Sequence, residues 1–385
     1  MWVFYKLLNK VNRISKRVYA PLIAFAIFFS LPVGAMEDGD GGSDRKVVRI
    51  LTVDGGGVRG IIPATVLRGI EEQLHTGKRE EEKLPLAEYF DIMAGTSTGG
   101  IIVLGLNAGM SAKNLVDLYL NHSEDIFPPV GLWDKAASYT GPKFSHEPLE
   151  KILDEKVGDR WLSESVSHVL IPAENMGQTY THLFNSAEAK KFESQDYKMK
   201  DVARATSAAP TFFEAATISN REGDESTFLD GGVSANDPTF EAIEIAEQKF
   251  PGCDIFIISL GTGEPPRKFG DYSLKTAGKI GWAPKIADEL MTKQQDRHLR
   301  VVHSIKNDRI QQDRKFVYHR IQVSIDRSIA DMDNAENVKS LRQAGLSLIN
   351  PLNPSGVYSV ITDQIIKVLE ENPEVQQKEM ERELL

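Results

Sequence analysis

A serine in a glycine-rich turn is the first feature of this sequence that could perform chemistry. Residues 95–99 read Gly-Thr-Ser-Thr-Gly, a G-x-S-x-G pattern centred on Ser97. The apolar run before it, at 89–94, predicts a strand, and the apolar run after it, at 101–108, predicts a buried helix. On such a strand-to-helix turn the hydroxyl projects above the sheet, and the helix N-terminus favours developing negative charge. Without that placement the pattern would indicate only a glycine-rich turn, so the flanking elements make Ser97 the predicted nucleophile.

A second glycine-rich turn follows the β-branched run at 47–53, which predicts another strand. Residues 54–60 read Asp-Gly-Gly-Gly-Val-Arg-Gly, and a helix with Pro63 in its first turn is expected next. Consecutive glycines let backbone N–H groups converge on one point without side chains in the way, as an oxyanion hole requires. The candidate donors are Gly55, Gly56 and Gly57.

The same glycines also fit G-x-G-x-x-G, the dinucleotide-binding pattern. That pattern requires an acid at the end of the next strand to hold the ribose. Here the acids at 80–82 lie in a charged loop ahead of the next strand, and that strand ends at the serine turn. No Gly-Lys-Ser/Thr follows the glycines, so a P-loop is excluded. The glycine turn therefore indicates an oxyanion hole rather than a nucleotide site.

A serine nucleophile needs a base, and an aspartate is a better candidate here than any histidine. The Asp-Gly-Gly turn at 230–232 follows a short apolar run, so the carboxylate of Asp230 can turn toward a neighbouring strand end. Taken in isolation, it would be an ordinary Asp-Gly turn. The order serine, acid, histidine of an α/β-hydrolase would need His298 or His303, which lie in a polar helical stretch typical of surface residues.

Apolar runs of strand length alternate with helical patterns from residue 47 to residue 263. This alternation predicts an α/β fold with three layers, α/β/α, around a mainly parallel sheet. In such sheets reactive groups gather at the carboxyl ends of the strands. From 264 to 385 the pattern predicts a mainly helical part packed on the core, with helices at 286–299, 335–349 and 360–369 and a solvated tail from Glu370.

The first 35 residues differ in kind from the rest. Basic residues precede a short apolar run at 20–31 that ends in small residues, a pattern typical of a secretory signal. We expect export to the periplasm or the medium, with an uncleaved anchor formed by residues 20–35 as the alternative. Residues 36–46, rich in glycine and acids, are expected to be a linker.

Composition excludes several classes of function. A formal net charge of -10 argues against a nucleic-acid binder, which needs a surplus of Lys and Arg on its binding face. The single cysteine, Cys253, excludes an intrachain disulfide and a cysteine-rich metal site. The sequence shows no calcium loop and no histidine ligand set.

Four motifs, in this order, resemble the patatin-like phospholipase domain. They are Asp-Gly-Gly-Gly-Val-Arg-Gly at 54–60, Gly-Thr-Ser-Thr-Gly-Gly at 95–100, Ala-Thr-Ser-Ala-Ala-Pro-Thr-Phe-Phe at 205–213 and Asp-Gly-Gly at 230–232. The resemblance implies that Ser97 is the nucleophile and that Asp230 is its partner in a Ser-Asp dyad without histidine. It further implies that the glycines at 55–57 form the oxyanion hole and that Arg59 positions the substrate.

The resemblance implies a carboxylic ester hydrolase of the phospholipase A2 or lipid acyl hydrolase type. The expected substrate is a phospholipid or another acyl-ester lipid, reached by transient contact with a membrane surface. No cofactor, metal or nucleic acid is expected. The alternative is a binding or storage protein that uses the same scaffold without catalysis.

Overall fold

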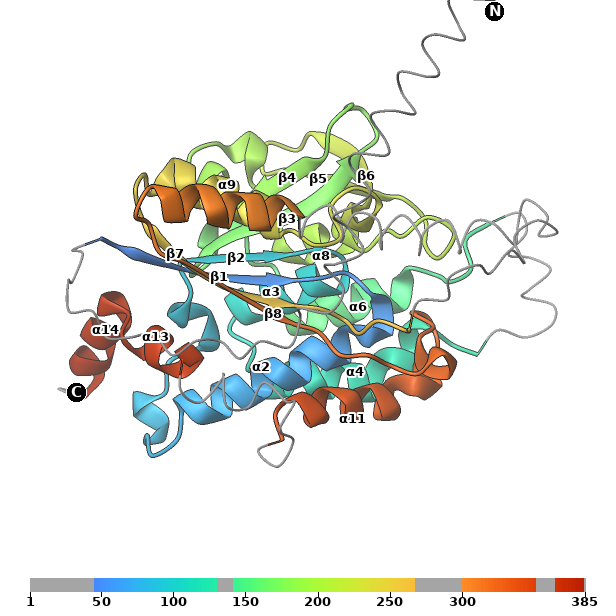
Figure 1. Cartoon of the computed structure of the whole chain (residues 1–385). Coiled ribbons are helices and arrows are strands. Elements are labelled where there is room, and N and C mark those ends of the chain that lie inside the picture. The colour runs from blue at the N-terminus through green and yellow to red at the C-terminus, as the bar shows by residue number, and fades with distance from the viewer. Residues whose placement is uncertain (1–44, 130–140, 267–299, 351–363, 384–385) are drawn as a thin grey trace, which may run out of the picture. The chain divides into compact units, whose positions relative to one another are not determined.

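The computed structural model describes residues 45–129, 141–266, 300–350 and 364–383 (Figure 1). All of them belong to one compact unit that begins at Arg45. The predicted signal or anchor at 1–35, most of the predicted linker and the predicted helix at 286–299 lie outside the described residues.

One mixed sheet forms the centre of the described chain. Its strand order is β5-β6-β3-β2-β1-β7-β8, with β4 paired to β3. The links β3-β2, β2-β1, β1-β7 and β7-β8 are parallel, whereas β4 and β6 run antiparallel to β3 and β5 runs antiparallel to β6. The strands are β1 Val47–Val53, β2 Ile92–Gly95, β3 His168–Asn175, β4 His182–Asn185, β5 Ala216–Ser219, β6 Glu225–Asp230, β7 Asp254–Leu260 and β8 Phe316–Ile321.

Helices cover both faces of this sheet, which confirms the predicted three-layer α/β/α architecture (Figure 1). The helix α9 lies on one face, and α2, α4 and α11 lie on the other. The α-helices described from end to end are α2 Ile61–Leu74, α3 Thr98–Asn107, α4 Ala112–Ile126, α6 Glu147–Lys156, α7 Ser186–Ala189, α8 Met199–Thr206, α9 Thr239–Lys249, α11 Val338–Leu348, α13 Ile366–Glu370 and α14 Pro373–Glu383. Residues 300–311 are also helical.

Strand β1 shows why its sequence is apolar without interruption. Ile50 packs in the cluster that contains Ala242 of α9, and its neighbour Leu51 packs in the cluster that contains Leu67 of α2. Because successive side chains of a strand point to opposite faces, a strand covered on both faces must be apolar at nearly every position.

The strand register brings three turns to one edge of the sheet. Val53 at the end of β1 pairs with Gly95 at the end of β2 and with Leu260 at the end of β7. The residues that follow these strand ends therefore emerge side by side. The glycine turn and the serine turn predicted from the sequence are among them.

The C-terminal part differs from the sequence-based expectation in two places. No strand is predicted from the sequence between 264 and 385, but β8 extends the sheet in parallel with β7. Its run Phe-Val-Tyr-His-Arg-Ile is half-buried and carries two basic side chains, so it lacks the apolar signature of the inner strands. The tail was predicted to be solvated, but in α14 Val375 is fully buried, so one side of this helix packs on the body.

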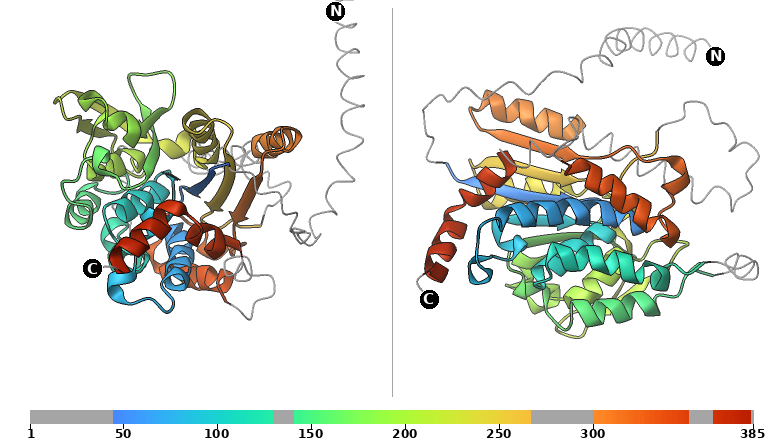
Figure 2. Two further views of the ribbon diagram at one scale, coloured as in Figure 1. Left: turned by 90° about the vertical axis from the view of Figure 1, so that its left-hand side faces the viewer. Right: turned by 90° about the horizontal axis from the view of Figure 1, so that it is seen from below.

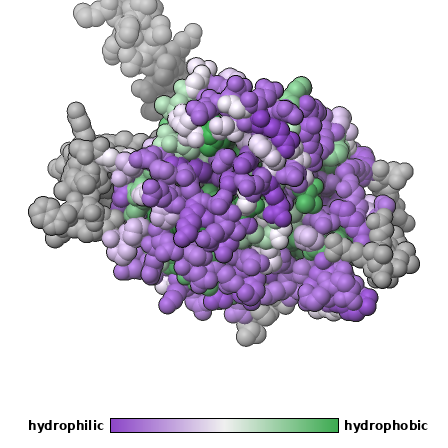
Figure 3. All heavy atoms as spheres, turned by 180° about the vertical axis from the view of Figure 1, so that it is seen from behind, coloured by the Kyte–Doolittle hydropathy of each residue, from purple (hydrophilic) through white to green (hydrophobic). Residues whose placement is uncertain are grey.

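One face of the described chain is mostly polar. Figure 3 shows the face opposite to that of Figure 1, where hydrophilic residues predominate and apolar patches are small and scattered. Figure 2 shows that the helices near the C-terminus lie beside α2. Among the described residues, no helix has both the length and the apolar character that a membrane crossing would need.

Candidate active site

Ser97 occupies a strained turn between β2 and α3. Its φ of 54° and ψ of -122° lie in a region that L-residues other than glycine rarely adopt. The turn is also tight, because a Cβ on Gly95 would lie 2.3 Å from the carbonyl oxygen of Gly99, and a Cβ on Gly99 would lie 2.2 Å from that of Val53. Both outer glycines of the motif are thus sterically required, and the strain holds the hydroxyl above the sheet edge.

The segment 205–213 ties the nucleophile turn to the acid turn. The backbone N–H of Ser97 donates to Thr206 Oγ1 at 2.9 Å, and that hydroxyl donates to the carbonyl of Pro172 at 2.6 Å. Two residues later the carbonyl of Ala208 accepts a hydrogen bond from the backbone N–H of Asp230 at 3.0 Å. The sequence gives no signal of a role for Thr206, whereas in the structure this residue orients the serine backbone.

Asp230 lies at the end of β6 and is almost wholly buried. Its Oδ1 accepts the backbone N–H of Gly232 at 2.7 Å. Burial raises the pKa of this carboxyl to about 6, and the hydrogen bonds from Gly232 N–H and from the Ser97 hydroxyl oppose the rise. The carboxylate is therefore ionised at neutral pH, yet it holds a proton more strongly than an exposed aspartate does.

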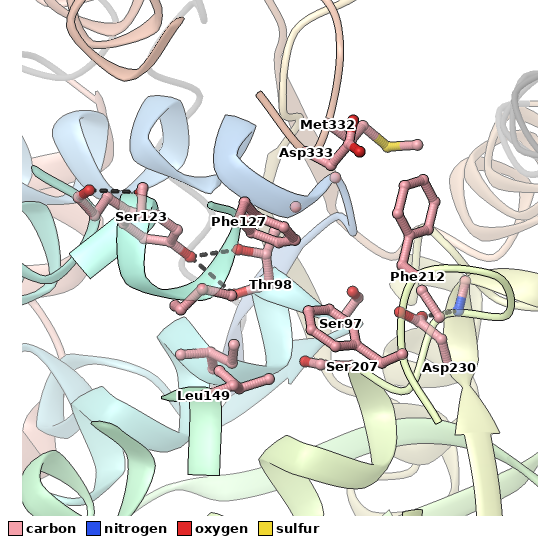
Figure 4. Close-up of a pocket in the computed structure, with 18 of the residues that line it drawn as sticks. Ser97, Thr98, Ser123, Phe127, Leu149, Ser207, Phe212, Asp230, Met332 and Asp333 are labelled. Carbon is pink, nitrogen blue, oxygen red and sulfur yellow. Dashed lines mark hydrogen bonds between the residues drawn. The ribbon is translucent and has the colours of Figure 1, made fainter. Parts of the chain in front are cut away.

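The Ser97 and Asp230 side chains face the same space, an apolar cavity of about 420 Å³ (Figure 4). The cavity runs from these two groups toward α4 and α6, and its wall is mostly hydrophobic. The apolar residues lining it include Ile101, Leu118, Ile126, Phe127, Leu149, Ile152, Leu153, Phe212 and Phe213. A reactive hydroxyl and an acid thus stand at one end of a chamber that suits an aliphatic chain.

Fewer residues of the glycine turn reach this cavity than the sequence predicted. The N–H of Gly55 is already bonded to the carbonyl of Asn236 at 3.1 Å, and Gly55 is not among the cavity-lining residues. Gly56 and Gly57 do line the cavity, and their N–H groups have no hydrogen-bond partner within the described chain. Of the three predicted donors, these two are available to a ligand.

Gly57 cannot be replaced by another residue without a rearrangement of the backbone that covers it. Its φ of 58° favours glycine, and a Cβ there would lie 2.1 Å from the carbonyl oxygen of Met332. That same carbonyl accepts the N–H of Val58 at 2.8 Å. A segment close to α11 therefore closes over the glycine turn, a contact that the sequence did not suggest.

Arg59 does not reach the cavity in this structure. Its Nη1 donates to the carbonyl of Ala330 at 3.3 Å, and the residue is not part of the cavity wall. The structure therefore brings Ser97, Asp230, Gly56 and Gly57 together and leaves Arg59 outside this group. In place of a contact with the cavity, Arg59 supports the segment that covers the glycine turn.

No histidine lines the cavity among the residues that the structure describes. His303 is exposed on a helix, and His298 lies outside the described ranges. Within those ranges no three His, Cys, Asp or Glu side chains gather as a metal site would need. Two acids of the described chain line the cavity, Asp230 and Asp333. Asp333 pairs with Lys143, whereas the Asp230 carboxylate accepts a hydrogen bond from the Ser97 hydroxyl.

Fold and site together define an α/β protein in which a strained serine turn stands beside a buried acid. A family model described as Patatin-like phospholipase matches residues 51–243, a segment that contains all of these groups. The chain belongs to this family.

Individual relatives agree with the family match. Patatin-like protein 3 of Arabidopsis thaliana is 35% identical over 273 residues, which cover 61% of this chain and 63% of that protein. Patatin-like protein 2 of the same plant is 32% identical over 350 residues, which cover 79% of this chain and 83% of that protein. A protein of Solanum tuberosum named Probable inactive patatin-3-Kuras 1 is 30% identical, with coverages of 61% and 68%.

Proposed function

We propose that this protein is a serine lipid acyl hydrolase that uses Ser97 as nucleophile and Asp230 as general base. The observation that carries the proposal is the meeting of the two side chains in the wall of one apolar cavity. Membership in the patatin-like phospholipase family supports a lipid ester as substrate.

In the proposed first step Asp230 accepts the Ser97 proton while the serine oxygen attacks the ester carbonyl. A carboxylate is a much weaker base than an alkoxide, so the proton must move as the new bond forms. The raised pKa of Asp230, about 6, brings its basicity closer to neutral pH and so favours this transfer. The N–H groups of Gly56 and Gly57 stabilise the oxyanion, and each such donor contributes about 10²- to 10³-fold in rate.

Collapse of the tetrahedral intermediate expels the alcohol part of the lipid, which takes the proton back from Asp230. Water then attacks the acyl-serine ester, again giving its proton to Asp230. The second collapse releases the fatty acid and restores the Ser97 hydroxyl. Every proton taken up by the carboxylate is thereby returned within one cycle.

The cavity supports a substrate with a long acyl chain. Each buried methylene contributes about 0.8 kcal/mol, or roughly fourfold in binding. The cavity wall formed by α4 and α6 is mostly apolar and includes Leu118 and Leu153. For this reason kcat/KM should increase with acyl length until the cavity is filled. Assays with p-nitrophenyl esters of increasing chain length measure this, and equal rates for acetate and long-chain esters would contradict it.

The decisive experiment compares the purified protein with Ser97→Ala and Asp230→Asn on a short-chain ester and on a phosphatidylcholine vesicle. The proposal expects both variants to lose activity while remaining folded. It also expects a fluorophosphonate probe to label the wild type but not Ser97→Ala. An unlabelled, inactive wild type would instead favour the binding or storage protein. For a phospholipid, identifying the released acyl chain tests the phospholipase A2 type.

Substrate access and export are further parts of the proposal. Val233, which is 46% exposed, stands at the cavity wall and suits transient contact with a lipid surface. Residues 1–35 are proposed to direct export or to anchor the chain. N-terminal sequencing of the protein isolated from its cells distinguishes the two, because cleavage would give a new terminus close to residue 36.

A further inference from the structure

A buried ion pair lies directly behind the glycine turn. Arg320, on β8, donates to both carboxylate oxygens of Asp54, with Nη1–Oδ1 at 2.9 Å and Nη2–Oδ2 at 2.5 Å. Nη1 also donates to Ser259 Oγ on β7 at 2.8 Å. Asp54 is the residue that opens the glycine turn, so this fork attaches the start of the turn to two neighbouring strands.

The same guanidinium faces a second buried acid. Arg320 Nη1 lies 3.8 Å from Asp237 Oδ2, and the other oxygen of Asp237 accepts the N–H of Thr239 at 3.0 Å, which fixes the start of α9. The residue before Asp237 is Asn236, whose carbonyl holds the N–H of Gly55. Arg320 therefore contacts both chain segments that frame the glycine turn.

The burial of these groups makes the arginine necessary. The Asp54 and Asp237 side chains are 4% and 2% exposed, so water does not solvate their charges. Burial raises the pKa of Asp54 to about 6, and Arg320 is the main influence that opposes the rise. For Arg320 itself, burial lowers the pKa, but attraction by Asp54 and Asp237 outweighs burial, so that its pKa lies above the usual value. Removing the guanidinium would leave two buried carboxylates without a counter-charge.

Neither Arg320 nor Asp54 lines the cavity, so neither can touch a substrate there. The turn that they hold, however, carries the N–H groups of Gly56 and Gly57 into it. Oxyanion donors act only when they are fixed in advance at the right place, and a displacement of about 1 Å can cost about 10²-fold in rate.

We infer that Arg320 is a positioning residue for the oxyanion hole, acting through Asp54 and Asp237 to hold the N–H groups of Gly56 and Gly57 toward Ser97. This inference rests on the proposed function. It assigns a role in that reaction to β8, which lies beyond the segment 51–243 that the family model matches.

The test compares Arg320→Met and Arg320→Lys in the full chain with a matched control, Arg309→Met. Arg309 is also a buried arginine, 3% exposed, and it pairs with Glu247 and the Cys253 carbonyl away from the cavity. Rates on a p-nitrophenyl ester, unfolding in urea, and amide hydrogen exchange over residues 54–60 are measured for each protein. A fourth protein, Arg320→Met/Asp54→Asn, removes both charges of the pair.

Arg320→Met is expected to lower kcat about 100-fold with KM nearly unchanged, and to speed exchange in 54–60. Arg320→Lys keeps the charge but loses the two-pronged hydrogen bond. Its kcat and its exchange rate should lie between those of Arg320→Met and the wild type. Arg309→Met should lose stability but keep its kcat and its exchange in 54–60. The double variant should regain stability and stay slow, because neutralising the charge does not restore the fork.

Full kcat together with unchanged exchange in Arg320→Met would overturn the inference, as would an equal loss of kcat in Arg309→Met. If Arg320→Met does not fold, Arg320→Lys and the double variant decide in the same way. A wild type without activity would instead refute the proposed function. Even then the exchange measurement would report whether Arg320 holds the turn.

Discussion

Two Asp-Gly-Gly turns follow strands of the same sheet, yet their aspartates face different partners. After β1, Asp54 turns away from the cavity onto Arg320, and the glycines that follow present N–H groups to the cavity. After β6, Asp230 itself faces the cavity, and the N–H of Gly232 turns inward onto its carboxylate. The turn after β1 thus presents N–H donors to the cavity, and the turn after β6 presents a carboxylate acceptor.

The difference between the turns comes from the neighbouring strands, not from the local sequence. Burial raises the pKa of both carboxyls to about 6. Asp54 has a guanidinium within hydrogen-bond distance, whereas no cation of the described residues is among the groups that act on Asp230. An acid paired with a guanidinium serves as a structural anchor, whereas an acid that accepts an N–H and a hydroxyl can still accept a proton.

The largest expected effect separates the two acids directly. Asp230→Asn should lower kcat/KM about 10⁴-fold, as loss of the acid does in other serine hydrolases, without lowering the free energy of unfolding at pH 7. Asp54→Asn should instead destabilise the protein by about 3 kcal/mol, because Arg320 would be left buried without its main partner. Steady-state kinetics and urea unfolding measure the two quantities. Equal losses of activity and stability in both variants would remove the distinction between the turns.

A smaller effect is expected in the turn after β1, which supplies the N–H donors. Gly57→Ala should lower kcat about 10²-fold, because the new Cβ would collide with the Met332 carbonyl and displace the N–H. Gly77→Ala is the matched control, since Gly77 also has a positive φ, 79°, but nothing lies within 4 Å of its added Cβ. The control should lose about 1 kcal/mol of stability and keep its kcat. An active Gly57→Ala would argue against this glycine as a donor.

The acceptor side predicts a pH dependence. Since Asp230 must be ionised to accept a proton and its pKa is about 6, kcat/KM should fall about tenfold per pH unit below pH 6 and level off above it. Stability should follow the opposite trend. The folded pKa lies above the unfolded value of 3.8, so this contribution is greatest below pH 4 and is lost as the pH rises through 6. Asp230→Asn should flatten part of that stability slope, which thermal unfolding from pH 4 to pH 7 would show.

The smallest effect is expected at Arg59. Its guanidinium contacts the Ala330 carbonyl and not the cavity, so Arg59→Met should change kcat/KM by less than about tenfold, or 1.4 kcal/mol. Rates on a neutral ester and on an anionic phospholipid are compared with those of the wild type. A much larger loss confined to the anionic lipid would restore the substrate-positioning role that the sequence resemblance implied.

Much of the fold could be predicted because its signals are local. The strand at 47–53, the helix around Leu67 and the buried helix after Ser97 were all predicted from the spacing of apolar residues. β8 was missed because an edge strand buries fewer side chains and tolerates polar ones such as His319 and Arg320. The tail was expected to be a solvated helix, and α14 is a helix, but its packing through Val375 was not predicted because few of its residues are apolar.

The glycines at which the backbone turns, and the serine and aspartate that are proposed to react, could be located from the sequence without the structure. Glycines at 95 and 99 flank a serine, and Gly57 and Gly231 follow the two aspartates, at positions where an added Cβ would collide with a backbone carbonyl. Tertiary structure alone decided what each group faces. The Arg320–Asp54 pair joins positions 266 residues apart, and the Thr206 contact to Ser97 joins positions 109 apart. Such partners are selected by how strands and helices pack, and no periodicity along the chain encodes them.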